Sequence, residues 1–97
     1  MTIVFHDAAR DELDEAVAHY ERQREGLGDE FNEEVQRAIQ RIVDFPEAWP
    51  KVRREARCCQ TDRFPYGINY VLRDWGVLIV AVAHLHRRTG YWKNRLR

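Results

Sequence analysis

Apolar side chains in the first half of the chain recur with the spacing of two amphipathic helices. The first stripe consists of Ala9, Leu13, Ala16, Val17 and Tyr20, at positions i, i+4, i+7, i+8 and i+11;. The second stripe repeats these spacings with Phe31, Val35, Ala38, Ile39 and Ile42. A Gly-Leu-Gly sequence separates the two stripes, and Pro46 follows the second one. The pattern predicts two helices joined as an antiparallel hairpin.

The second half has the short apolar runs of β-strands. Residues 77–83 are seven consecutive apolar residues, most of them β-branched, which indicates a strand buried on both faces;. We expect further strands at about residues 52–54, 58–64 and 68–73, a short opening strand at residues 2–5, and a hairpin turn at residues 74–76;. A two-helix hairpin cannot cover its own apolar stripes and needs a sheet to lie on. The predicted fold is therefore α+β: an N-terminal strand and an antiparallel helical hairpin packed on a mainly antiparallel sheet of about four strands.

Composition narrows the class of protein. A chain of 97 residues with 44% hydrophobic residues and three tryptophans fits one folded domain, residues 1–97;. No apolar run approaches the ~20 residues of a membrane-spanning helix, and no secretion signal is visible. Cys58 and Cys59 are adjacent, cannot join distant elements and suit a reducing cytoplasm, which is the expected location;. Without a C-x-x-C pair or a dinucleotide or phosphate-loop motif, we expect no metal and no cofactor.

The net charge of zero conceals a strong asymmetry. Residues 1–48 carry thirteen acidic residues against five arginines, whereas residues 49–97 carry eleven basic residues against three acidic ones. One interpretation is two solvated faces; the other is an anion-binding basic surface for nucleic acid or an acidic protein. We expect Arg57, Arg63 and Arg73 to gather with the C-terminal residues on the sheet face opposite the helices. The predicted binding residues are Arg53, Arg54, Arg57, Arg63, Arg73 and Trp92.

The residues directly after the buried strand could carry chemistry. These are His84, His86, Arg87, Arg88 and Tyr91. Imidazole can move a proton, arginine can bind phosphate, and an aromatic ring can stack on a base, so together they could cleave RNA through its 2′-hydroxyl. Alternatively, the histidines and arginines form a hydrogen-bonded corner with solvated charges, and the aromatic pair fastens the chain end to the core. The helix carboxylates Asp11, Glu12, Asp14 and Glu15 are expected to be solvated surface.

Two segments carry a family resemblance. Arg63-Phe-Pro-Tyr-Gly-Ile-Asn-Tyr70 and Val80-Ala-Val-Ala-His-Leu-His-Arg-Arg88, with the opening strand and both helices, resemble the RelE/ParE superfamily of toxins from bacterial type II toxin–antitoxin systems. The resemblance covers nearly the whole chain. It implies a compact α+β fold, a cytoplasmic location and a cognate antitoxin encoded alongside.

The superfamily divides by target. RelE-like members cleave mRNA on the ribosome, and ParE-like members inhibit DNA gyrase. Many RelE-like chains carry an arginine after the tyrosine that corresponds to Tyr66, where this chain has Gly67. The first hypothesis is therefore a ParE-like gyrase inhibitor neutralised by its antitoxin. The alternatives are a RelE-like nuclease, in which the five residues after the strand would be catalytic, and a non-toxic binding module. Whether the chain is an enzyme stays open at this point.

Overall fold

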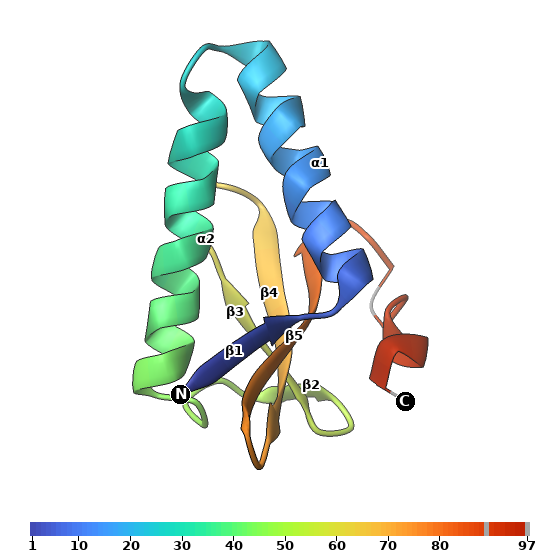
Figure 1. Cartoon of the computed structure of the whole chain (residues 1–97). Coiled ribbons are helices and arrows are strands. Elements are labelled where there is room, and N and C mark those ends of the chain that lie inside the picture. Colours follow the sequence, from blue (N-terminus) through green and yellow to red (C-terminus); the bar gives the residue numbers. More distant parts are fainter. Residues whose placement is uncertain (89, 97) are drawn as a thin grey trace.

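The computed structural model describes residues 1–88 and 90–96 of the chain. Strand β1 (Thr2–Phe5) leads into helices α1 (Asp7–Gln23) and α2 (Leu27–Asp44), which form a hairpin (Figure 1). Four strands follow: β2 (Lys51–Arg53), β3 (Ala56–Gln60), β4 (Tyr66–Arg73) and β5 (Gly76–His84). A short 3-10 helix, η1, covers Lys93–Leu96. The predicted α+β class and helical hairpin are confirmed.

Among the described residues, five strands form one mixed sheet in the order β1-β5-β4-β3-β2. β1 pairs in parallel with β5, and the other neighbouring pairs are antiparallel. The sheet has one strand more than the expected four or so, because the opening segment joins it as an edge strand. Gly76 permits the close approach of β1: its φ is +148°, and a Cβ there would meet the carbonyl oxygen of Thr2;.

Both helices bury their apolar stripes against one face of the sheet. α1 buries Ala9, Leu13 and Ala16, and the buried apolar residues of α2 are Phe31, Val35, Ala38, Ile39 and Ile42. They share one core cluster with the β4 and β5 residues that face them, among them Ile68, Tyr70 and Ile79. Full burial of such a side chain contributes about 1.5–3 kcal/mol, so this interface holds the hairpin on the sheet. No helix in the described part of the chain is long and apolar enough to span a membrane.

The strand boundaries agree with the sequence pattern at β5 and differ at β3. Within residues 77–83, every residue except Leu78 is buried. The strand expected at residues 58–64 instead runs from Ala56 to Gln60. The chain turns at Thr61, whose hydroxyl donates a hydrogen bond to the carbonyl of Phe64 at 2.6 Å. Residues 61–65 therefore lie outside the sheet, which changes where Arg63 points.

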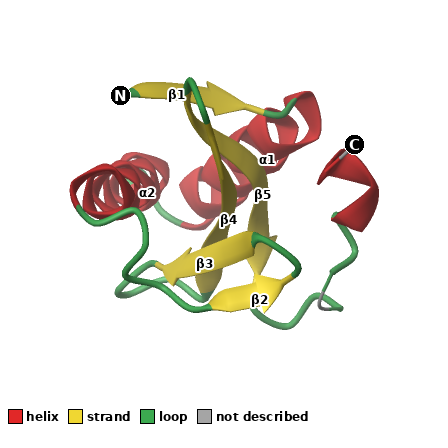
Figure 2. Cartoon of the chain, turned by 90° about the horizontal axis from the view of Figure 1, so that it is seen from below, coloured by secondary structure: helices red, strands yellow, loops and turns green. Residues whose placement is uncertain are grey.

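The C-terminal segment (residues 90–96) covers the other face of the sheet. Figure 2 shows α2 and this segment on opposite sides of the strands. Trp92 is only 3% exposed and packs with Ala56, Val71 and Val80 in a second apolar cluster. Tyr91 and Leu96 border the same cluster. Trp92 thus fastens the chain end to the sheet, which was one of the two roles considered for it.

Candidate functional site

The residues after β5 are held in place by a tight turn. The backbone N–H of Leu85 donates to Pro65 O at 2.8 Å, and that of Arg87 donates to His84 O at 3.0 Å. His84 Nδ1 accepts a hydrogen bond from the backbone N–H of His86 at 3.0 Å, so the neutral ring carries its proton on Nε2;. The rings of Tyr66 and His86 pack edge-on against His84. The result is a fixed imidazole that leaves Nε2 for a ligand.

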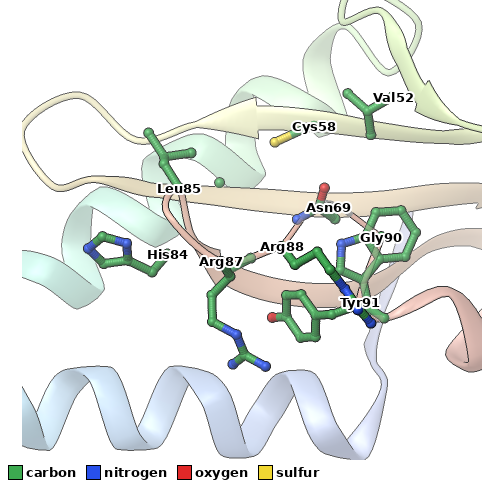
Figure 3. A pocket seen from close by; sticks show the side chains of 12 residues that line it. Val52, Cys58, Asn69, His84, Leu85, Arg87, Arg88, Gly90 and Tyr91 are labelled. Carbon is green, nitrogen blue, oxygen red and sulfur yellow. The ribbon is translucent and has the colours of Figure 1, made fainter.

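His84 borders a pocket between the sheet and the C-terminal segment, with a volume of about 130 Å³. Figure 3 shows Arg87, Arg88 and Tyr91 grouped around it, with Asn69 on the neighbouring strand. The Arg87 guanidinium lies over the Tyr91 ring, 3.8 Å from its centroid, as in a cation–π contact;. The pocket is lined by Val52, Cys58, Gly67, Asn69, Ala83, His84, Leu85, Arg87, Arg88, Gly90, Tyr91 and Trp92. The structure therefore brings together most of the residues predicted to carry chemistry, with His86 beside the pocket rather than in its lining.

The Tyr91 hydroxyl is already engaged. It donates a hydrogen bond to Glu12 Oε2 at 2.6 Å. Burial, and then this hydrogen bond to a carboxylate, raise the pKa of Tyr91 above its usual value;. A phenol held protonated in this way cannot act as a base near neutral pH. In this arrangement Tyr91 supports Arg87 through its ring.

Glu12 joins α1 to β5 and to the C-terminal segment. Besides Tyr91, its carboxylate accepts hydrogen bonds from the backbone N–H of Val82 at 3.0 Å and from Arg95 at 2.9 and 3.1 Å. Arg95 also donates to Val80 O at 3.0 Å. β1 pairs with β5 only as far as Ile79, so beyond it the edge of β5 has no neighbouring strand in the described structure;. Glu12 and Arg95 bind the Val82 N–H and the Val80 carbonyl at this edge instead. The expectation that Glu12 is solvated surface is wrong.

Arg53 and Arg54 lie at the edge of the sheet beside the C-terminal segment. The Arg53 side chain packs against Gly90, where an added Cβ would lie 3.0 Å from Arg53 Cδ. Its Nε is buried and has no hydrogen-bond partner among the described residues. Arg54 is exposed in the turn after β2, with φ of +51°. Arg53 therefore borders the pocket, while Arg54 faces solvent nearby.

The expected gathering of Arg57, Arg63 and Arg73 at this pocket is wrong. Arg57 pairs with Tyr70 across β3 and β4, which places it on the helix-covered face, and it donates to Trp49 O at 2.6 Å;. Arg73 forms an ion pair with Glu55 at 2.8 Å, at the opposite end of β4 from the pocket. No common cationic pocket collects these groups.

Arg63 is instead held at α2. Its Nε and its backbone N–H donate to Glu34 at 2.6 and 2.9 Å, and the backbone N–H of Asp62 donates to the same carboxylate at 3.0 Å. Glu34 is only 3% exposed. Burial disfavours its charge, but the hydrogen bonds from Arg63 and Asp62 outweigh burial and keep the pKa of Glu34 below its usual value. Arg63 thus fastens the loop after β3 to the helix.

Cys58 and Gly67 form part of the pocket floor. A Cβ at Gly67 would lie 2.6 Å from Cys58 Sγ and 3.5 Å from Leu85 Cδ2. Any larger side chain at this position must displace the thiol. Burial and the neighbouring Cys59 raise the pKa of Cys58 to about 11, so it stays a neutral thiol at neutral pH;. The space beside Gly67, the residue after Tyr66, is thus occupied by Cys58 and Leu85.

Taken together, the pocket offers two guanidinium groups, one imidazole and one amide on apolar walls. This set can bind an anionic or hydrogen-bonding group. Within residues 1–88 and 90–96, no group of three or more histidine, cysteine, aspartate or glutamate side chains could hold a metal ion.

Comparison with known proteins shows the family to which this chain belongs. The sequence model for the ParE toxin of the type II toxin–antitoxin system, parDE, matches residues 3–89. A solved structure of the chromosomal ParDE TA system from P. aeruginosa superposes with a TM-score of 0.63 at 14% identity, covering 87% of this chain and 95% of that one. That similarity shows a shared fold. A search of curated proteins finds no match. Because the family match spans nearly the whole chain, this protein belongs to the ParE toxin family of type II toxin–antitoxin systems.

Proposed function

We propose that the protein is a toxin that inhibits DNA gyrase by binding it and is neutralised by a cognate antitoxin. Membership of the ParE family supports the class of activity. The observation that carries the choice of gyrase over mRNA is the pocket floor at position 67. Many RelE-like nucleases have an arginine at this position, whereas here a side chain at Gly67 would collide with Cys58 Sγ. Such a toxin would act in the cytoplasm, where gyrase and the antitoxin are found.

The geometry of the aromatic and basic groups favours binding over catalysis. RNA cleavage needs a base, an acid and a clamp for the scissile phosphate. Here the Tyr91 hydroxyl is committed to Glu12 and held protonated, so it cannot supply the base. The positive charge of Arg87 and Arg88 in the pocket lining, with Arg53 against Gly90, is instead suited to a protein or DNA–protein target with acidic groups;.

A supercoiling assay tests this proposal. Purified protein, with its fold verified by circular dichroism, is titrated into gyrase acting on relaxed plasmid. We expect inhibition at micromolar protein, and roughly tenfold weaker inhibition by an Arg87→Ala, Arg88→Ala double variant. Arg73→Ala is the matched control, because it removes one arginine far from the pocket and should inhibit like the wild type. A folded protein without any effect on supercoiling removes gyrase as the target.

One observation favours a second function. His84 and His86 lie side by side, with ring centroids 4.9 Å apart, next to Arg87 and Arg88. Two imidazoles could supply the acid and base of a ribosome-dependent mRNA nuclease. Toeprinting on programmed ribosomes would then show A-site cleavage that a His84→Ala, His86→Ala double variant lacks. If induced expression of folded protein leaves growth unchanged, the remaining alternative, a non-toxic binding module, is favoured over both toxins.

A further inference from the structure

The side-chain amide of Asn69 lines the pocket. Asn69 is 6% exposed and makes no side-chain hydrogen bond to another described residue. Figure 3 shows the Asn69 amide beside the pocket lining formed by Arg88 and Tyr91. An amide in this position is ready to donate to a bound group and accept from it.

The charges around the pocket specify an anion. Its lining contains Arg87 and Arg88 but no aspartate or glutamate. Neither guanidinium forms an ion pair with a carboxylate in the described part of the chain, and Arg87 is positioned by its contact with Tyr91. The buried, unpaired Nε of Arg53 lies close by, against Gly90. A carboxylate that enters the pocket therefore meets guanidinium and amide N–H donors in its lining;.

The volume and the apolar lining of the pocket suit an anionic group carried on a short chain of methylene groups. Cavities of roughly 150 Å³ hold a benzene-sized molecule, so a volume of about 130 Å³ takes a group of about five non-hydrogen atoms;. The walls include Val52, Ala83, Leu85 and Trp92, which suit methylene groups. A glutamate side chain has this size and this combination of stem and charge.

The surroundings of the pocket indicate that the group is part of a polypeptide. A second hollow, lined by Glu12, Glu15, His19 and Tyr66 among others, adjoins the pocket and shares His84 and Arg87 with it. A chain crossing His84 would occupy both hollows, whereas a free carboxylate would use only the first. We infer that the pocket anchors a glutamate side chain of a partner polypeptide. The identification of that partner as the antitoxin rests on the proposed function.

A titration with short peptides tests the anchor. The isotope-labelled full chain is titrated with acetyl-Ala-Ala-Glu-Ala-Ala-amide, and the side-chain amide signals of Asn69 are followed by NMR. We expect saturable shifts with a Kd on the order of 1 mM, as is reasonable for a group of about five atoms. The matching glutamine peptide should bind roughly tenfold more weakly, because it lacks the charge. Equal binding of the two peptides, or no shift of Asn69, overturns the inference.

Variants and a free acid sharpen the test. Asn69→Asp places a like charge beside the anion and should abolish binding, and Arg88→Gln should weaken it roughly tenfold. Arg73→Gln, outside the pocket, should bind as the wild type does. Free glutarate that binds as tightly as the peptide overturns the assignment to a polypeptide. The titration involves no gyrase, so a failed titration with intact gyrase inhibition overturns the anchor alone, and the reverse result overturns the proposed target alone.

Discussion

Replacing Glu12 with alanine removes the acceptor of four hydrogen bonds that connect α1 with β5 and the C-terminal segment. The carboxylate and the Arg95 guanidinium form an ion pair with side chains only 14% and 18% exposed. After the substitution, the Arg95 charge, the Val82 N–H and the Tyr91 hydroxyl all lose their partner. We expect the C-terminal segment to loosen and the free energy of unfolding to fall.

The magnitude follows from the burial of the pair. Removing one partner of a buried ion pair costs about 3–5 kcal/mol, because the remaining charge is left uncompensated. The unpaired Val82 N–H and Tyr91 O–H add to this cost, but water entering the vacated space offsets part of it. We therefore expect a loss of about 4 kcal/mol. For a domain of this size each kcal/mol lowers the Tm by about 4–8 °C, so the melting temperature should fall by at least 15 °C or so.

Urea unfolding at pH 7, followed by circular dichroism, measures this loss. Asp14→Ala is the control, because Asp14 is an exposed carboxylate on the same helix and should change stability by less than about 0.5 kcal/mol;. Adding Arg95→Met to Glu12→Ala should recover at least about 1 kcal/mol by removing the uncompensated charge. A Glu12→Ala variant as stable as Asp14→Ala would refute this reasoning about the strand edge.

Three further predictions concern titration and packing. Burial raises the pKa of all four tyrosines, that of Tyr70 to about 12, so the folded chain should ionise fewer tyrosines than the unfolded chain at the same alkaline pH. Stability should therefore fall as the pH rises past 10, because the unfolded chain releases these protons more readily, and absorbance at 295 nm would show both effects. The pKa of Glu34 is lowered in the folded chain, so its carboxylate stabilises the fold at pH values above the pKa of the unfolded carboxyl;. The difference in stability between the wild type and Glu34→Gln should therefore shrink as the pH falls below about 4. A difference that does not depend on pH in urea titrations would contradict this. Gly67→Ala should lower the free energy of unfolding by about 1–3 kcal/mol, because the added methyl group meets Cys58 Sγ;. Adding Cys58→Ala to this variant should restore most of the lost stability, and thermal melts of the single and double variants test this contact.

The parts of the fold set by local patterns could be predicted from the sequence. The two helices followed from the 3.6-residue spacing of their apolar residues, and β5 followed from its unbroken apolar run. The surroundings of Glu12 could not be predicted, because its partners Tyr91 and Arg95 are about eighty residues away and meet it only when the C-terminal segment folds back. From α1 alone, Glu12 looks like any other solvated carboxylate.

The position of the basic residues was harder to predict for a similar reason. Arg63 was expected to point from a strand, but the chain leaves the sheet at Thr61, and a buried glutamate on α2 binds Arg63 instead. The face on which Arg57 lies depends on its pairing with Tyr70, and the sequence of that strand left the register open. The residues after β5 were located correctly because a buried strand ends directly before them. Their roles in binding or catalysis remain predictions.

Plasmid topology after induced expression tests the central claim most directly. The chain is expressed in bacteria that carry a reporter plasmid, and the linking number of the plasmid is measured before growth stops, with total mRNA analysed from the same cells. If the toxin binds gyrase, the plasmid should lose negative supercoils while mRNA remains intact, and the Arg87→Ala, Arg88→Ala variant should leave topology unchanged. Normal supercoiling with cleaved mRNA, in cells whose growth has stopped, would contradict the account.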